Sequence, residues 1–194
     1  MMEKKTTYKI FTIADYDEEA AYLRKMHKAG WQLTKVNLSP FLLVVKYTFE
    51  KCLPEDYSYQ LDFQPLEKAD QAHYFQLFDD YGWEHVLDFN SFSYFRKPVS
   101  KIKSEEEFEI YNDSRSKLGM MKRIVDQRLL PVIAGTLALS SSVWMIMKRH
   151  SSFSLLTYII LVIVSTLLLL LLGILIHIVR RFLIKRRELT NLDD

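Results

Sequence analysis

Two long uncharged stretches dominate the pattern of hydrophobic and polar positions. Residues 129–147 form a run of 19 without a charged side chain, and residues 153–179 form a run of 27 in which His177 is the one side chain that could be charged near neutral pH. A helix rises about 1.5 Å per residue, so roughly 20 apolar residues cross the hydrocarbon core of a bilayer. Both runs are predicted to be transmembrane helices. The short connector 148–152 would make them antiparallel neighbours.

Positive charges around these runs predict their orientation. The connector holds Lys148 and Arg149, whereas ten basic side chains flank the hairpin on its other side. These are Arg115, Lys117, Lys122, Arg123, Arg128, Arg180, Arg181, Lys185, Arg186 and Arg187. Because basic flanks stay in the cytoplasm, we expect a multi-pass protein of the cell membrane with both termini cytoplasmic. The five that follow the second run are expected to contact anionic lipid headgroups.

The first hundred residues contain an internal repeat with an offset of 52 residues. The segment from Tyr22 to Trp31 matches the segment from Tyr74 to Trp83 in its tyrosine, its apolar positions, its glycine and its tryptophan. In each copy a helical pattern stops at a glycine, which is the usual residue just past a helix. The repeat predicts the order strand–helix–strand–strand, twice.

Hydrophobic alternation and turn residues place the elements of each copy. Strands are predicted at 8–13, 31–38, 41–50, 57–63, 83–89 and 92–97, and helices from Asp15 or Asp17 to Ala29 and over 67–81. Residues 1–98 would form a cytosolic duplicated α+β domain, an antiparallel sheet with two helices on one face. An all-α transmembrane hairpin would follow this domain.

The rest of the chain connects and flanks the hairpin. Residues 99–111 are predicted to be a charged linker, residues 112–128 a juxtamembrane helix and residues 180–194 a basic cytoplasmic tail. The juxtamembrane stretch has an apolar face beside basic residues, which is typical of a helix at a membrane surface.

Composition changes along the chain at about the same place. Residues 1–100 hold 20 of the 26 aromatic side chains and a net charge of −3, whereas residues 101–194 have a net charge of +5. The acidic first part lacks the basic surface that direct binding to nucleic acid requires. Cys52 is the single cysteine, which excludes a disulfide framework, and the N-terminal residues do not resemble a signal peptide.

Four segments carry a resemblance to a known family. They are Phe49-Glu-Lys-Cys-Leu-Pro-Glu-Asp-Tyr-Ser-Tyr-Gln-Leu-Asp-Phe63, Asp80-Tyr-Gly-Trp-Glu84, Tyr94-Phe-Arg-Lys-Pro98 and Asn112-Asp-Ser-Arg115. Together they resemble a family of unknown function, common in Gram-positive bacteria, with a soluble domain and two membrane helices. Genes of this family often lie beside a PadR-like repressor gene. The resemblance implies an accessory regulatory role, in some cases linked to drug efflux, and it carries over no catalytic residue.

A second resemblance concerns topology alone. Duplicated strand–helix–strand–strand modules are similar to the effector-binding domains of the gyrase-inhibitor-like group. Those domains bind hydrophobic cations with aromatic rings and a buried carboxylate. The resemblance implies a possible hydrophobic or cationic ligand, but a shared fold does not determine function.

Candidate site residues are few. The sequence has no phosphate-binding loop, no His-x-x-x-His pair and no nucleophile motif, so we expect neither an enzyme nor a cofactor or metal site. Asp62 and Glu84 are either solvated surface residues or rim carboxylates of an aromatic pocket suited to a cation. Leu42 and Val44 lie on the second apolar side of the strand at 41–50, which could pack against the other repeat, a ligand, a second copy or a partner.

Two functions are compatible with these patterns. The first is a membrane-anchored cytoplasmic sensor or adaptor that works with a PadR-like regulator or a drug-efflux system. The second is a structural or assembly subunit whose hairpin packs against a larger membrane transporter. In the first transmembrane run, Ala134, Ala138 and Ser142 recur every four residues, which allows the close approach of another helix.

Overall fold

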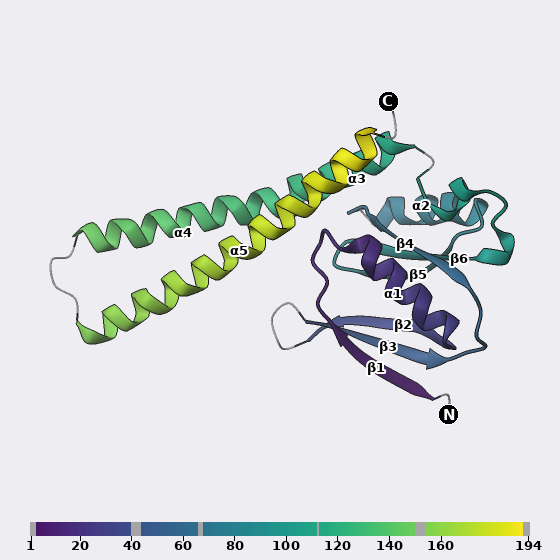
Figure 1. The fold of residues 1–194 in the computed structure, drawn as a ribbon, viewed down its shortest axis with the longest axis horizontal. Coiled ribbons are helices and arrows are strands. Elements are labelled where there is room, and N and C mark those ends of the chain that lie inside the picture. Colours follow the sequence, from purple (N-terminus) through teal and green to yellow (C-terminus); the bar gives the residue numbers. More distant parts are fainter. Residues whose placement is uncertain (1–2, 40–43, 66–67, 112, 150–153, 192–194) are drawn as a thin grey trace. The chain divides into compact units, whose positions relative to one another are not determined.

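The computed structural model describes residues 3–39, 44–65, 68–111, 113–149 and 154–191. The chain forms two compact units, Met1–Met120 and Met121–Asp194. The first unit contains antiparallel sheets and helices, and the second contains long apolar helices (Figure 1). The predicted combination of an α+β part with a C-terminal helical part is therefore confirmed.

The first unit contains eight main elements. These are β1 (Lys4–Lys9), α1 (Tyr16–Lys28), β2 (Trp31–Leu38), β3 (Val45–Lys51), β4 (Tyr57–Phe63), α2 (Lys68–Asp80), β5 (Glu84–Phe89) and β6 (Phe92–Pro98). The strands form two antiparallel sheets of three, with the orders β1-β3-β2 and β4-β6-β5. The prediction of a single sheet is wrong, because the strands pair within each half of the unit.

The layers differ from the prediction in a second way, because the helices do not share one face. Helix α1 lies between the two sheets, and α2 covers the opposite face of the second sheet (Figure 1). The Glu19 carboxylate of α1 accepts hydrogen bonds from Tyr47 of β3 and from Tyr94 of β6. On the far side of β6, Phe78 of α2 lies against Phe95, with ring centroids 4.4 Å apart. The second sheet is consequently buried on both faces.

Two glycines end the two helical segments as predicted. Gly30 has a φ of 81° and Gly82 a φ of 79°, which is the left-handed region where a β-carbon is unfavourable. A β-carbon at position 30 would also lie 3.1 Å from the carbonyl oxygen of Cys52. Any side chain there would force the loop before β4 to move.

The tryptophans that follow these glycines are not equivalent. Trp83 is 3% exposed and packs with Phe78 under the partly buried Ile110. Trp31 is half-buried, and the ammonium group of Lys51 lies 4.4 Å from its ring centroid. Trp31 is therefore not a core residue like its repeat counterpart Trp83, because a lysine lies over its ring in place of an apolar segment.

Residues 99–111, expected to be a linker, pack against the second sheet. They contain two 3₁₀ turns, Val99–Lys101 and Glu105–Phe108, before α3 begins (Ser114–Ile124). The carbonyl oxygen of Phe108 accepts hydrogen bonds from the side chains of Ser58 and Gln60 on β4. These bonds hold the segment on the face of the sheet that α2 also covers.

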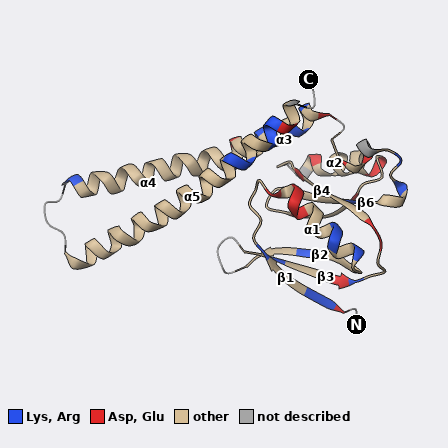
Figure 2. Cartoon of the chain, viewed as in Figure 1, with Lys and Arg blue, Asp and Glu red and all other residues tan. Residues whose placement is uncertain are grey.

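The second unit contains a π-helical turn and two long helices. The turn spans Val125–Leu129, α4 spans Leu130–Arg149 and α5 spans Leu155–Asn191. By length and composition, the structure has two helices able to cross a membrane. Helix α5 has 37 residues, about 55 Å at the usual helical rise, which exceeds a bilayer core. The expected basic tail is largely helical, and Figure 2 colours its basic residues blue along the C-terminal part of α5.

Candidate functional site

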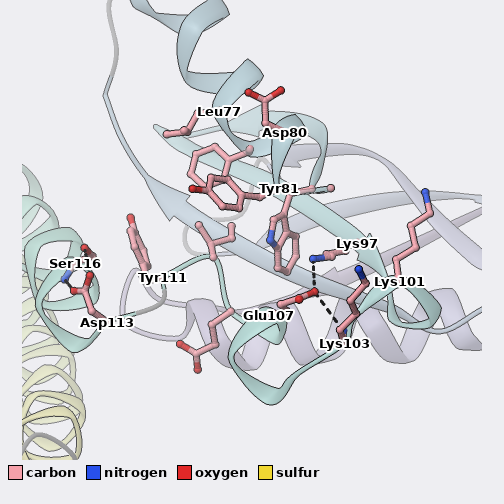
Figure 3. Close-up of a pocket in the computed structure, with 15 residues that line it drawn as sticks. Leu77, Asp80, Tyr81, Lys97, Lys101, Lys103, Glu107, Tyr111, Asp113 and Ser116 are labelled. Atoms are coloured by element: carbon pink, nitrogen blue, oxygen red, sulfur yellow. Dashed lines mark hydrogen bonds and ion pairs between the residues drawn. The ribbon is translucent and has the colours of Figure 1, made fainter.

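A pocket of about 790 Å³ lies in the first unit, beside the end of α2 (Figure 3). One part of its lining comes from Leu77–Trp83, which ends α2 and leads into β5, and another from Lys97 on β6. The larger part comes from the segment between Lys101 and Ser116. The pocket therefore forms where the chain after β6 folds back over the end of α2.

Aromatic side chains provide its apolar wall. Phe78 and Trp83 line the pocket and belong to a buried cluster with Phe95, against which Ile110 packs. Tyr81 lines the pocket and is 63% exposed. Tyr111 comes from the segment between Lys101 and Ser116, here called the returning segment. Because this wall is backed by close-packed core, it can present a fixed surface to a flat apolar group.

A buried lysine provides the main charge. Lys97 is 6% exposed, and its Nζ donates to the Oε2 atom of Glu107 at 3.0 Å (Figure 3). The same oxygen accepts the backbone N–H of Lys103, and the hydrogen bond from Lys97 holds the pKa of Glu107 below its usual value. A β-carbon at Gly82 would lie 3.6 Å from the lysine Cε atom, so the stem of Lys97 runs closely along this glycine.

Three other carboxylates line the pocket, each with a partner. Asp80 accepts from Gln76 at 2.8 Å, and Glu109 pairs with Lys117 at 2.9 Å. Asp113 accepts from the backbone N–H and the hydroxyl of Ser116 and so caps the first turn of α3. These carboxylates serve the fold of the pocket walls.

Asp62 does not line the pocket, but it contacts Tyr111, which does. It is 2% exposed and accepts hydrogen bonds from the hydroxyls of Tyr74 on α2 and Tyr111. Burial, followed by the charge of Asp62, raises the pKa of Tyr74. The expectation of a solvated Asp62 is wrong, because two tyrosines replace water around it. Asp62 thus fastens both α2 and the returning segment to β4.

A second buried carboxylate, Glu19, lies between the sheets. It is 8% exposed, and its Oε1 atom accepts from Tyr47 at 2.7 Å and from Tyr94 at 2.6 Å. Burial raises the pKa of Glu19, although both hydrogen bonds act in the opposite direction. Sequence reasoning missed this residue because it stands in an acidic first turn, which is typical of a solvated helix end.

The remaining predicted site residues that the structure describes do not line the pocket. Leu42 lies outside the described residues, and Val44 is half-buried just before β3. The Glu84 side chain is 55% exposed and pairs with Arg96 at 2.7 Å. On α5, Arg180, Arg186 and Arg187 are exposed, and Arg181 and Lys185 are half-buried. In the described part of the chain, no group of three or more His, Cys, Asp and Glu side chains could hold a metal ion.

His27 is a neutral core histidine. Its Nδ1 atom lies 2.8 Å from the hydroxyl of Tyr59, and its ring stacks on Tyr57 with centroids 4.3 Å apart. Burial, with the charge of Arg96, lowers the pKa of His27 to about 4. The residue therefore favours the folded state when it is uncharged.

This environment predicts a loss of stability in mild acid. The unfolded chain protonates His27 near pH 6.5, but the folded unit does so only near pH 4, so stability should fall as the pH decreases through this window. We expect a contribution of about 3 kcal/mol from His27. His27→Phe, which keeps the stacked ring, should flatten the fall. Thermal unfolding of the full chain in detergent at pH 7, 5.5 and 4 measures this fall in stability. His73→Phe, at an exposed histidine of α2, is the matched control. If stability falls with decreasing pH as steeply in His27→Phe as in the wild type, His27 is not the cause of the fall.

Comparisons with known proteins give one match. A family model described as a protein of unknown function (DUF2812) matches residues 15–133. No curated protein and no solved structure matches the chain. The matched range contains all the lining of the pocket and both buried carboxylates.

Proposed function

The chain belongs to the DUF2812 family of proteins of unknown function, and we propose that it is a membrane-anchored cytoplasmic sensor or adaptor. The first unit would recognise a ligand or partner without catalysis, and α4 and α5 would hold it at the bilayer. Anchoring raises the local concentration of the unit near any membrane partner.

One observation carries this proposal. More than half of the pocket lining comes from the segment Lys101–Ser116, which continues directly along the chain into α3 and α4. A molecule that binds in the pocket must contact this segment. A change in the segment can then reach the membrane helices by the shortest covalent path, which suits a sensor better than an isolated binding module.

The orientation is part of the proposal. The basic side chains before α4 and in the C-terminal part of α5 support cytoplasmic termini, and the five on α5 support contact with anionic headgroups. A single cysteine introduced at position 150, in a Cys52→Ser background, should be labelled from outside intact cells. A cysteine at position 190 should react only after permeabilisation. Labelling at 190 and not at 150 would reverse the orientation.

The partner and the origin of the fold also remain proposals. The resemblance to the Gram-positive family supports a PadR-like regulator or a drug-efflux system as the partner. The equal strand orders of the two sheets, and the two glycines at matching positions, support an origin by duplication.

An assembly subunit is the second candidate function. In α4 the small residues Ala134, Ala138 and Ser142 are exposed along the helix, although α4 and α5 contact each other. Small residues allow close packing of another transmembrane helix, such as one from a transporter.

Site-specific photocrosslinking in living cells separates the two candidates. A photoreactive amino acid at position 101 reports on the pocket rim, one at position 138 on α4, and one at the exposed position 35 serves as control. A sensor or adaptor should give a regulator adduct, or a small-molecule adduct, from position 101. An assembly subunit should give a transporter adduct from position 138. Equal capture from positions 101 and 35 would contradict the sensor proposal.

A further inference from the structure

We infer that the pocket beside Trp83 takes a small anionic molecule with a flat apolar body, such as an aromatic carboxylate. This inference rests on the proposed sensor function and specifies its ligand class. It is carried by the size of the pocket, the chemistry of its wall and the distribution of its charges.

The size and wall suit a small molecule. The volume of about 790 Å³ lies within the usual range of ligand pockets, which are lined by apolar and aromatic groups with a few polar ones. Here Phe78, Trp83 and Ile110 supply an apolar wall backed by Phe95. A flat ring can pack against this wall without displacing core side chains.

The lysines give the pocket its selectivity. Lys97, Lys101 and Lys103 all line it, and Glu107 is the carboxylate that pairs with Lys97 (Figure 3). Among the described side chains, which exclude those of residues 105 and 106, no carboxylate lies within ion-pair distance of Lys101 or Lys103. A buried ammonium group needs a partner, and a ligand carboxylate can supply one with less exposure to water than Glu107 has.

The other lining carboxylates do not favour a cation. To bind one, Glu109 would have to leave Lys117, or Asp113 would have to uncap α3. The exposed carboxylate of Asp80 is bound to Gln76. An anion could bind Lys101 or Lys103 without breaking any of these contacts. At Lys97 it would have to share the ammonium group with Glu107 or displace Glu107.

Replacement of Glu107 would connect binding to the rest of the chain. Its Oε2 atom accepts from both Lys97 and the backbone of Lys103, so it closes the turn before Phe108. An anion on Lys97 would release this carboxylate and loosen the turn within the segment that leads to α3. The same contact would therefore both select the ligand and report its presence.

The test compares three probes of similar size and different charge. The full chain in phosphatidylcholine nanodiscs is titrated by calorimetry with 1-naphthoate, 1-naphthylmethylammonium and 1-naphthalenemethanol, with empty nanodiscs as reference. We expect naphthoate to bind at least about tenfold more tightly than the ammonium probe. Lys97→Met should weaken naphthoate binding about tenfold, and Glu107→Gln should strengthen it, because it removes the competing charge. Lys35→Met, at an exposed lysine on β2, is the matched control.

The exposed variant Lys103→Met should also weaken naphthoate binding, which keeps the test valid if Lys97→Met fails to fold. Preference for the ammonium probe, or naphthoate binding that neither lysine variant changes, would overturn the anion inference. Binding of the neutral probe in those cases would leave the pocket as a ligand site and the sensor proposal intact. Failure of all three probes, together with no specific adduct from position 101, would overturn both.

Discussion

Replacing Glu19 by alanine should lower the free energy of unfolding of the α+β unit by roughly 2–6 kcal/mol, because two buried hydroxyl groups would lose their acceptor. Tyr47 and Tyr94 both donate to the Oε1 atom of this residue, from different sheets. Denaturant unfolding of the full chain in detergent measures the loss. Glu18→Ala, at the exposed neighbour on α1, should change stability by less than about 0.5 kcal/mol.

Glu19→Gln should have a different effect, since it keeps the Oε1 acceptor and removes the charge. The pKa of Glu19 is raised in the folded state, so its contribution to stability is fully present below pH 4.5 and is lost as the pH rises through the raised pKa. Above that pKa the glutamine variant should therefore be as stable as the wild type or more so, with less dependence on pH. A loss in Glu19→Gln equal to that in Glu19→Ala would show that the charge itself is required.

Replacing Trp83 by alanine should cost about 3–5 kcal/mol, as expected for a large aromatic side chain in a packed core. Trp31→Ala should cost clearly less, because Trp31 is half-buried and its ring faces lysine. Near-ultraviolet circular dichroism during denaturant unfolding of the full chain follows both variants. Trp83 also lines the pocket, so its variant should bind naphthoate more weakly at temperatures where it is still folded.

Equal losses for the two tryptophan variants would contradict the unequal burial of the two rings. They would indicate that the two halves of the unit have equivalent cores, as the repeat alone predicts. A loss below about 1 kcal/mol for Trp83→Ala would mean that the cluster with Phe78 and Phe95 relaxes around the gap.

The sequence predicted local structure well where one face of an element is apolar. The strands at 31–38 and 57–63 have the predicted bounds, and both helices end beside the predicted glycines. The burial of the second sheet on both faces was not predictable from alternation. Ser58 and Asp62 mark the polar side of β4, but a backbone carbonyl and two tyrosines satisfy them, so polar positions there are core positions.

The pocket was beyond the reach of the sequence for a related reason. Two of its lysines, Lys101 and Lys103, and Glu107 belong to a charged stretch after Pro98, and such composition is typical of a solvated linker. One signal was present, because Tyr111 and Ile110 interrupt this stretch with apolar groups too large for a simple spacer. The repeat also suggests equal burial of Trp31 and Trp83, which is not observed, because the segment that covers Trp83 has no counterpart over Trp31.

Because α1 is covered by both sheets, the order in which the two halves of the unit are synthesised constrains how the chain folds. A nascent chain that ends near Cys52 contains one sheet and α1, but the side of α1 that carries His27 still lacks Tyr57 and Tyr59. Stable structure must wait for β4 and β6, whose contacts with α1 span up to 75 residues. Such long-range contacts slow folding, and the apolar helices follow soon after them in translation. Folding of the α+β unit and synthesis of the two long apolar helices thus overlap in time, and slow translation near residue 98 would give the unit its best chance to form first.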